Sequence, residues 1–252
     1  MDGNLLDPLI PLMRAAGRAV MEVYATEVQV RGKADQSPVT EADVRAEAII
    51  LDGLRSLTPD VPIIAEESVA AGRVPEVGAR FWLVDPLDGT REFISRNGEF
   101  TVNIALVRDG VPVLDLVLAP ALDRLYAGAQ GRGAFVEDAA GRRVIHARSV
   151  PPEGLTVVAS RSHGDAAALD AFLAGRKVAS LASAGSSLKL CLVAAGEADL
   201  YPRLGRTMEW DIAAGQAVVL AAGGAVTDLA GKALRYGKPG FENPHFVASG
   251  LP

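Results

Sequence analysis

The sequence predicts an α+β fold in which sheets are layered between helices. Helical patterns near the start of the chain are followed by short alternating segments rich in β-branched residues, which are typical of an antiparallel meander. After Pro151-Pro152 the pattern changes, and strands alternate with helices as in an α/β layer. We therefore expect an α+β half over residues 1–150 and an α/β half over residues 151–252.

Two helices are expected at the start of the first half. Residues 4–25 carry apolar side chains at helical spacing. After a loop or short hairpin, a second helix begins near Thr40, because Thr40 and Asp43 have the spacing of a capping box with Asp in place of Glu. We expect the core face of this helix to carry apolar residues: Val44, Ala48, Leu51 and Leu54.

The remaining elements follow from short apolar or alternating segments that end at turn residues. The strands expected in the first half are 61–68, 80–86, 100–107, 111–120, 124–130, 133–138 and 142–147, and residues 89–97 are expected to form one or two helical turns. The strands expected in the second half are 155–163, 177–185, 198–203 and 225–229, and the helices are 165–175, 186–196 and 211–224.

Composition and charge exclude several classes of protein. The net charge of −6 argues against general nucleic-acid binding, since no basic run is present. The longest apolar run is interrupted by Gln216 and Gly223-Gly224, so no membrane-spanning helix is expected, and the N-terminus is unlike a signal peptide. We expect a cytoplasmic protein in which the single cysteine, Cys191, and Met208 are core residues.

Acidic residues stand where predicted strands end or predicted helices begin. Glu66 and Glu67 follow "VPII", Asp85 and Asp88 follow "FWLV", and Asp211 opens the last long helix. Ligands and catalytic groups of α/β layers collect at such edges. These acids are therefore candidates for a single site.

Converging carboxylates would need either protons or a cation. At a separation of ~4 Å, each like-charge pair repels by about 4 kcal/mol at an effective dielectric constant near 20. A divalent cation removes this repulsion, and carboxylate ligands without nearby His or Cys favour a hard ion, Mg²⁺, over Zn²⁺. No histidine or cysteine pair in the chain has zinc-ligand spacing.

Each of these acids also has a purely structural explanation. Asp88 and Gly89 could form an ordinary turn, Asp43 could serve only as the capping-box acid, and Asp211 could be a favourable first-turn acid. Glu66-Glu67 could be a solvated loop. Taken singly, each structural explanation is favoured. Taken together they are weaker, because no turn requires the whole string D-P-L-D-G-T after an apolar strand.

Three motifs in order resemble those of the inositol monophosphatase superfamily of metal-dependent, lithium-sensitive phosphatases. They are "EES" at residues 66–68, "DPLDGT" at 85–90 and "WDIAAG" at 210–215, and "SPVTEAD" at 37–43 also fits. The resemblance covers nearly the whole chain and implies a layered αβαβα sandwich like that of the inositol monophosphatase and fructose-1,6-bisphosphatase proteins.

A closer similarity is to bacterial 3′(2′),5′-bisphosphate nucleotidases. It rests on "REFISRNGEFTVNIAL" (91–106), "SRSH" (160–163) and "GSSLKLCLVAAGEADLYPR" (185–203). These enzymes convert 3′-phosphoadenosine 5′-phosphate to AMP and so clear a by-product of sulfate assimilation. The inositol branch usually has an Asn-Phe and His element after its "DGT", whereas this chain has Arg91-Glu92-Phe93, which favours the nucleotide over inositol phosphate as the main substrate.

The resemblance implies a set of metal ligands. Glu66, Asp85 and the backbone carbonyl of Leu87 would bind a first Mg²⁺, and Asp85, Asp88 and Asp211 would share a second. A weaker third Mg²⁺ would involve Glu66 and waters. Mg²⁺ would lower the pKa of bound water and offset charge on the reacting oxygens.

The resemblance also implies catalytic and substrate contacts. Thr90 and Asp43 would polarise the attacking water, helped by Glu66, the amides of Gly89 and Thr90 would hold the phosphate, and Glu67 would support the site. Four residues of the second half would contact the other phosphate and the sugar or adenine: His163, Ser186, Lys189 and Arg203. Lys189 could instead be a solvated helix residue, and His163 a loop residue.

Other functions remain open from the sequence. The alternatives are a phosphatase of the same superfamily acting on inositol monophosphate, histidinol phosphate or fructose bisphosphate, and a non-catalytic sensor that binds a phosphonucleotide. The expected partner is a small phosphonucleotide and not a nucleic acid. Relatives include monomers and homodimers, and some bacterial relatives lie at the cytoplasmic face of the inner membrane.

Overall fold

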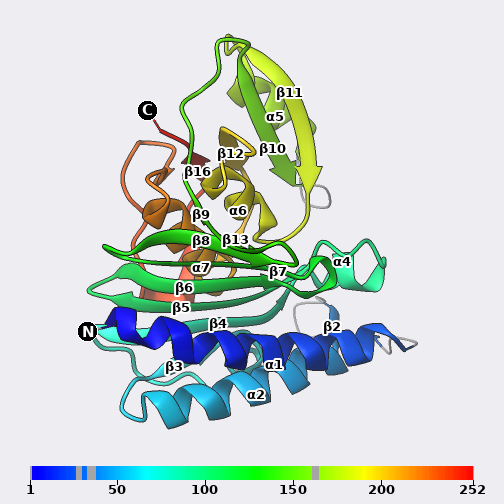
Figure 1. Cartoon of the computed structure of the whole chain (residues 1–252), viewed down its shortest axis with the longest axis vertical. Helices are drawn as coiled ribbons and strands as arrows, with labels where there is room; N and C mark the ends of the chain where they lie inside the picture. The colour runs from blue at the N-terminus through cyan, green and yellow to red at the C-terminus, as the bar shows by residue number, and fades with distance from the viewer. Residues whose placement is uncertain (1, 27–29, 33–37, 161–164, 252) are drawn as a thin grey trace.

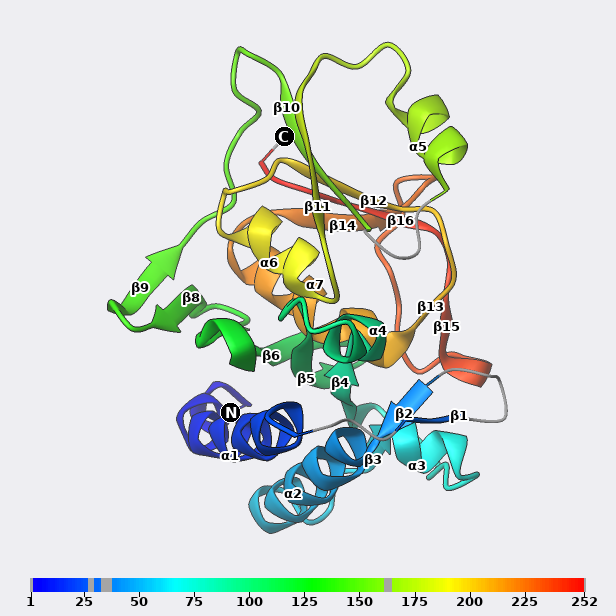
Figure 2. The same ribbon diagram turned by 90° about the vertical axis from the view of Figure 1, so that its right-hand side faces the viewer.

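The computed structural model describes residues 2–26, 30–32, 38–160 and 165–251. Its layers are visible in Figure 1, where helices α1 (Leu6–Tyr24) and α2 (Glu41–Leu57) cover one face of a large sheet. Helices α6 (Leu188–Ala194) and α7 (Glu209–Ala221) lie between the large sheet and a smaller one. Figure 2 shows α5 (Ala166–Leu173) on the side of the small sheet away from α6. The expected α+β class and its αβαβα layering are confirmed.

The large sheet has seven strands in the order β3-β4-β5-β6-β7-β8-β9. The pair β3–β4 is parallel, and all later neighbours are antiparallel, which confirms the expected meander. The strand bounds are β3 Ile63–Ala65, β4 Arg80–Asp88, β5 Thr101–Arg108, β6 Val111–Ala119, β7 Arg124–Ala129, β8 Gly133–Asp138 and β9 Gly141–Ile145.

The small sheet has five strands in the order β11-β10-β12-β16-β14. Strand β10 pairs in parallel with β11 and β12, whereas β16 is antiparallel to both of its neighbours. The strand bounds are β10 Leu155–Ser160, β11 Val178–Ala184, β12 Leu200–Arg203, β14 Ala225–Asp228 and β16 Phe246–Ser249. The sequence did not indicate β16 or the short antiparallel pair β13 (Thr207–Met208) and β15 (Glu242–Asn243).

Short elements complete the chain. The expected hairpin before α2 is the antiparallel pair β1 (Val30–Gly32) and β2 (Pro38–Thr40). The remaining helices are α3 Glu66–Ala70 and α4 Thr90–Ile94, with the 3₁₀ turns η1 Asp2–Leu5, η2 Pro120–Leu122 and η3 Pro239–Phe241. In the described ranges, no helix is long and apolar enough to span a bilayer.

The capping box of α2 is confirmed, but its predicted core face is right only for Leu54 and for Leu51, which is half-buried and packs against the core. Val44 is 58% exposed, whereas Ala42, Ala46 and Ile50 are buried together with Asp43 and Glu47. The helix is turned so that these two acids reach their hydrogen-bond partners at the starts of α2 and α3. Small alanines on the same face then allow close packing.

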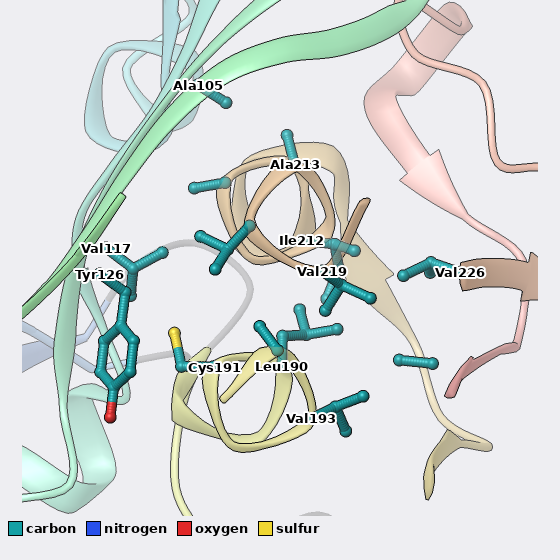
Figure 3. Packing of buried hydrophobic residues seen from close by; sticks show 14 of the residues in the cluster. Ala105, Val117, Tyr126, Leu190, Cys191, Val193, Ile212, Ala213, Val219 and Val226 are labelled. Carbon is teal, nitrogen blue, oxygen red and sulfur yellow. The ribbon is translucent and has the colours of Figure 1, made fainter. Parts of the chain in front are cut away.

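Two hydrophobic cores lie on opposite faces of the large sheet. One packs α1 and α2 against it, and the other joins the sheet to α6, α7 and the small sheet. Figure 3 shows the second core, where Cys191 and Leu190 of α6 point toward sheet and α7 side chains. A Cβ on Gly215 of α7 would lie 2.4 Å from Leu190 Cδ1, so glycine permits this close helix contact. Cys191 is a core residue as expected, whereas Met208 is only half-buried.

The chain crosses from the large sheet to the small one between β9 and β10, near Pro151-Pro152. Helices α6 and α7 belong to the second half of the chain but pack against both sheets. The division into two halves stays a prediction, and residues of both halves belong to the second core.

Candidate active site

A cavity of about 540 Å³ lies between the carboxyl end of β4 and the starts of α6 and α7. Both halves of the chain line it. Its acidic side chains are Glu66, Asp85, Asp88, Glu92 and Asp211, and its basic side chains are Arg91, Lys189, Arg203 and Arg206. The structure therefore brings the predicted metal ligands and three of the predicted substrate contacts, Ser186, Lys189 and Arg203, into one cavity.

A β-bulge in β4 turns Asp85 and Asp88 toward the same cavity. Side chains alternate along a strand, so residues three apart would normally face opposite sides of the sheet. Here Asp85 pairs with Asn103 and Asp88 pairs with Thr101, so β4 contains one residue more than β5. The extra residue restores the alternation. Both carboxylates then line the cavity, while Leu87 lies in the core beneath α1 and α2.

The turn after β4 is fixed by Gly89 and Thr90. Gly89 has φ +89°, and a Cβ there would lie 3.2 Å from Ser186 Cβ and 3.3 Å from Glu92 Oε2, so glycine is required. Thr90 Oγ1 donates to the Leu87 carbonyl at 3.3 Å, and the Leu87 N–H donates to Asp85 Oδ1 at 3.0 Å. The D-P-L-D-G-T segment is thus a compact structure held by its own polar groups.

Glu66 is held in place by an acid that the sequence reasoning missed. Glu47 of α2 is 4% exposed and accepts from the Glu67 N–H at 2.9 Å and from Ser68 Oγ at 2.7 Å. These two bonds fix the start of α3, which carries Glu66 into the cavity. The signal that could have found Glu47 is its position one helical turn after Asp43, on the same face of α2.

Asp211 is held at the start of α7 by capping. Its Oδ2 accepts from the Met208 N–H at 2.8 Å. Glu209, which the sequence reasoning also missed, is fully buried and accepts from the N–H groups of Gly237 and Lys238 at 2.7 and 3.0 Å. Lys238 Nζ adds an ion pair with Glu209. The loop between β14 and β15 therefore anchors the helix start that presents Asp211.

The cavity acids disfavour ionisation in one another. Burial is the largest cause that raises the pKa of Asp85 well above its ordinary value. The charges of Glu66, Asp88 and Asp211 raise it further. Burial, Asp88 and Glu66 likewise raise the pKa of Asp211, against the opposing effects of the Met208 N–H and Arg203. Burial also raises the pKa of Asp88, although Lys189 and hydrogen bonds from Ser187 oppose it.

The donor set fits a hard divalent cation. The acids crowd their charges together in a buried site, and a bound cation would remove that conflict. In the described ranges, no group of three or more Asp, Glu, His or Cys side chains is arranged so that it could hold a metal ion. A metal is favoured by the oxygen chemistry of the cluster and by its electrostatics.

The predicted substrate contacts differ in their surroundings. Lys189 is 4% exposed and donates to the carbonyls of Ala184 and Ser186 at 3.2 and 2.6 Å, which overturns its alternative as a solvated helix residue. Burial lowers the pKa of Lys189 to about 8. The charge of Asp88 acts in the opposite direction, and that of Arg203 acts in the same direction. Arg203 donates to the Arg206 carbonyl at 3.1 Å, and its buried Nε has no partner in the described ranges. His163 lies outside the described residues.

Asp43 is not among the residues that line the cavity. Its Oδ2 accepts from the N–H and the Oγ1 of Thr40, both at 2.7 Å. The capping role is confirmed, and the catalytic role remains a prediction. Glu67 likewise does not line the cavity.

Comparison with known proteins decides the family. The inositol monophosphatase family is matched over residues 3–249. The chain belongs to the inositol monophosphatase family. Proteins of this family are metal-dependent phosphatases.

Several members of the inositol monophosphatase family are similar over their whole length. A protein of Escherichia coli named 3′(2′),5′-bisphosphate nucleotidase CysQ is 50% identical over 248 residues, covering 97% of this chain and 99% of the relative. The crystal structure of CysQ from Bacteroides thetaiotaomicron has a TM-score of 0.83 and 35% identity, covering 100% of this chain and 98% of that one. An IMPase from Thermotoga maritima has a TM-score of 0.80 and 31% identity, covering 99% and 92%.

Proposed function

We propose that this chain hydrolyses 3′-phosphoadenosine 5′-phosphate to AMP and phosphate by attack of an activated water. The observation that carries the proposal is the pairing, in one cavity, of a carboxylate cluster with the buried Lys189 and the half-buried Arg203. The carboxylates of Asp85, Asp88 and Asp211 suit a metal-assisted reaction at one phosphate. Lys189 and Arg203 suit a second anionic group on the same substrate. The relatives named 3′(2′),5′-bisphosphate nucleotidase support the same substrate class.

The residues proposed to hold two Mg²⁺ are those of the β4 turn and the starts of α3 and α7: Glu66, Asp85, the Leu87 carbonyl, Asp88 and Asp211. A weaker third Mg²⁺ is proposed at Glu66. Bound Mg²⁺ would lower the pKa of its water ligand and offset charge on the attacking and leaving oxygens. No side chain needs to form a covalent phosphoenzyme.

The chain's own residues orient the reacting groups. Thr90 Oγ1, held by the Leu87 carbonyl, is proposed to position the water, with Asp43 as a further polarising group. The amides of Gly89 and Thr90 are proposed to hold the phosphate that is removed. This arrangement supplies position and electrostatic stabilisation, which are the main protein contributions in phosphoryl transfer.

The nucleotide contacts are proposed to come from the second half of the chain. Ser186, Lys189, Arg203 and His163 would contact the retained phosphate and the nucleoside. Arg203 Nε, which has no partner among the described residues, and the Lys189 ammonium, which has three donors, both have hydrogen-bonding capacity for an anion. A volume of about 540 Å³ lies within the range of small-molecule sites.

The second candidate is an inositol monophosphatase activity, favoured by the similarity to solved inositol monophosphatases. It would use the same acids and would leave the second-half cations without a ligand. A non-catalytic sensor is a weaker candidate because the proposed metal-binding acids and Thr90 are all present. We further propose a role in clearing a by-product of sulfate assimilation, inhibition by lithium, and a monomer or homodimer as the assembly.

The experiment is phosphate release from 3′-phosphoadenosine 5′-phosphate and from inositol 1-phosphate at matched concentrations, with Mg²⁺ and with EDTA. We expect a strong preference for the nucleotide that EDTA abolishes. Preference for the inositol ester would keep the metal site and reject the nucleotide contacts. Turnover that EDTA leaves unchanged would reject the metal assignment.

A further inference from the structure

A buried hydrogen-bonded bridge joins two cavity acids that come from different halves of the chain. It consists of Asn103 on β5, which is 1% exposed, and Ser187 at the start of α6, which is 2% exposed. Asn103 Nδ2 donates to Ser187 Oγ at 3.0 Å and to Asp88 Oδ2 at 3.4 Å. Ser187 Oγ donates to the Asp211 carbonyl at 2.7 Å. Contacts thus run from Asp88 to Asp211 through Asn103 and Ser187, and Ser187 also bonds Asp88 directly.

The position of Asn103 follows from the sheet. It is the register partner of Asp85, and its neighbour Thr101 on the same face is the partner of Asp88. The β4 bulge therefore places both acids beside this end of β5. Because β5 pairs on both edges within the sheet, Asn103 is a rigid support for groups on the flanking loops.

Packing alone does not explain an amide at this position. Further along β5, the same face carries Ala105 and Val107, which belong to the core. At the cavity end the face becomes polar, and the buried Asn103 Oδ1 and Thr101 Oγ1 have no partner in the described ranges. A buried unpaired polar atom is unfavourable, so an apolar residue would be the more stable choice here.

The chemistry of the side chain suits a supporting role. An amide Nδ2 donates to a carboxylate without adding charge to a cluster that is already crowded with acids. An aspartate of the same shape would remove the donor and add another negative charge. The bridge contacts Asp88 through its side chain and Asp211 through its backbone, so it bears on how far apart these two residues lie.

We propose that Asn103 is a positioning residue, which through Ser187 fixes the separation of Asp88 and Asp211 for the divalent cation that they share. This inference rests on the proposed function, because it assigns a support to the same metal site. Groups that hydrogen-bond to metal-binding carboxylates commonly change metal affinity or activity about 10- to 100-fold when removed. We therefore expect the removal of Asn103 to change the Mg²⁺ concentration that the reaction requires.

The test compares Asn103→Ala, Asn103→Asp and Ser187→Ala with the wild type. Two quantities are measured for each: the Mg²⁺ concentration for half-maximal hydrolysis, and the rise in Tm when Mg²⁺ replaces EDTA. We expect Asn103→Ala to raise the half-maximal Mg²⁺ concentration about 10- to 100-fold and to reduce the Mg²⁺-dependent rise in Tm. Asn103→Asp should raise the requirement further, and Asn103→Ser, which keeps a hydroxyl donor, should recover part of the loss.

Thr58→Val is the matched control. Thr58 Oγ1 accepts from Trp82 Nε1 at 2.9 Å. Trp82 lies on β4, the strand that carries Asp88, at the end away from the cavity. This variant loses a buried hydrogen bond, so its Tm in EDTA should fall, but its Mg²⁺ requirement should equal that of the wild type. A general loss of sheet stability is thereby separated from a loss of positioning.

Specific outcomes would overturn the proposal. A wild-type Mg²⁺ requirement and Tm response in Asn103→Ala would do so while leaving the proposed function intact. Additive effects in the Asn103→Ala/Ser187→Ala double variant would also do so, since members of one bridge should not add. If Asn103→Ala fails to fold, Ser187→Ala at the cavity wall tests the same bridge. A wild-type protein without any Mg²⁺ response would overturn both the bridge and the proposed function.

Discussion

The carboxylate of Asp88 lies between opposing influences. Burial and Glu66 raise its pKa, while Lys189 and hydrogen bonds from Ser187 lower it. It is half-buried at the cavity wall and belongs to neither hydrophobic core. Its energetic role is therefore electrostatic and local, and removing its charge should affect the reaction more than the fold.

We predict that Asp88→Asn abolishes turnover without unfolding the protein. Loss of one carboxylate from the proposed metal site should lower kcat on the order of 10²–10³-fold or more, as for other removed electrostatic groups. In EDTA the Tm should stay equal or rise, because the neutral amide relieves repulsion from Glu66. Hydrolysis assays and thermal unfolding check this, with the exposed helix residue Asp170→Asn as control. Wild-type activity in Asp88→Asn would reject the metal assignment.

Lys189 is proposed to serve substrate recognition and not the reaction itself. Its ammonium already donates to two backbone carbonyls, at Ala184 and Ser186, and lies 5.4 Å from the Tyr201 ring centroid. It therefore holds the loop before α6 while its remaining donor capacity faces the cavity.

We predict that Lys189→Ala raises KM for 3′-phosphoadenosine 5′-phosphate about 10- to 100-fold, which corresponds to ~1.5–3 kcal/mol for a hydrogen bond to a charged group. KM for a simple monophosphate ester should change much less, because that ester has no second phosphate. Steady-state kinetics on both substrates check this. The exposed Lys177→Ala should change neither value. An equal increase for both substrates would assign Lys189 to the loop alone.

At the scale of elements, the sequence predicted the order of most helices and strands but not the details that aim side chains. The motif acids and the capping box could be found because their spacing is local. The β4 bulge could not, because it depends on pairing with Asn103 and Thr101 of another strand. The buried face of α2 was misplaced because exposed Val44 competed with the buried acid Glu47 in the apolar pattern.

Short strands were missed for a related reason. β13 and β15 have two residues each, so they carry too few positions to show alternation. Their strand conformation comes from tertiary pairing with partners far along the chain, such as Thr207 with Asn243.

We predict that Glu47→Ala weakens activity through the start of α3. It removes two bonds to a buried carboxylate, so Glu66 loses its fixed position, and kcat/KM should fall about 10- to 100-fold. The free energy of unfolding should fall by about 1.5–3 kcal/mol. Activity assays and urea unfolding check both, and Glu41→Ala on the exposed face of α2 should leave kcat/KM unchanged. Wild-type kcat/KM in Glu47→Ala would show that α3 is positioned without this acid.

At the scale of the whole molecule, Asp199 fastens the segment that crosses between the sheets. Its side chain is fully buried and accepts from Arg148 Nε at 2.7 Å, Arg148 Nη2 at 3.2 Å and the Thr156 N–H at 2.7 Å. Its own carbonyl accepts from the Gly250 N–H, and the Arg148 carbonyl accepts from the Leu251 N–H. The Asp199 carboxylate thus joins the crossing segment to β10, and the backbone carbonyls of Asp199 and Arg148 hold residues 250 and 251 beside them.

We predict that Asp199→Asn lowers the free energy of unfolding by about 1.5–3 kcal/mol at neutral pH, because bonds to a charged group are lost in a buried place. Burial alone would raise the pKa of Asp199, but the bonds from Arg148 and Thr156 lower it below its ordinary value. A carboxylate whose pKa is lower in the folded state contributes its full stability above the unfolded pKa, ~3.9, and loses it as the pH falls through the folded value.

The difference in the free energy of unfolding between wild type and Asp199→Asn should therefore stay constant from pH 7 to about 5 and close in more acidic solution. Urea unfolding across this range measures it. The exposed Asp123, which pairs with Arg14 at 2.7 Å, provides the control, since Asp123→Asn should cost only ~0–1 kcal/mol. A difference that persists undiminished below the folded pKa would mean that Asp199 acts through its shape and not through its charge.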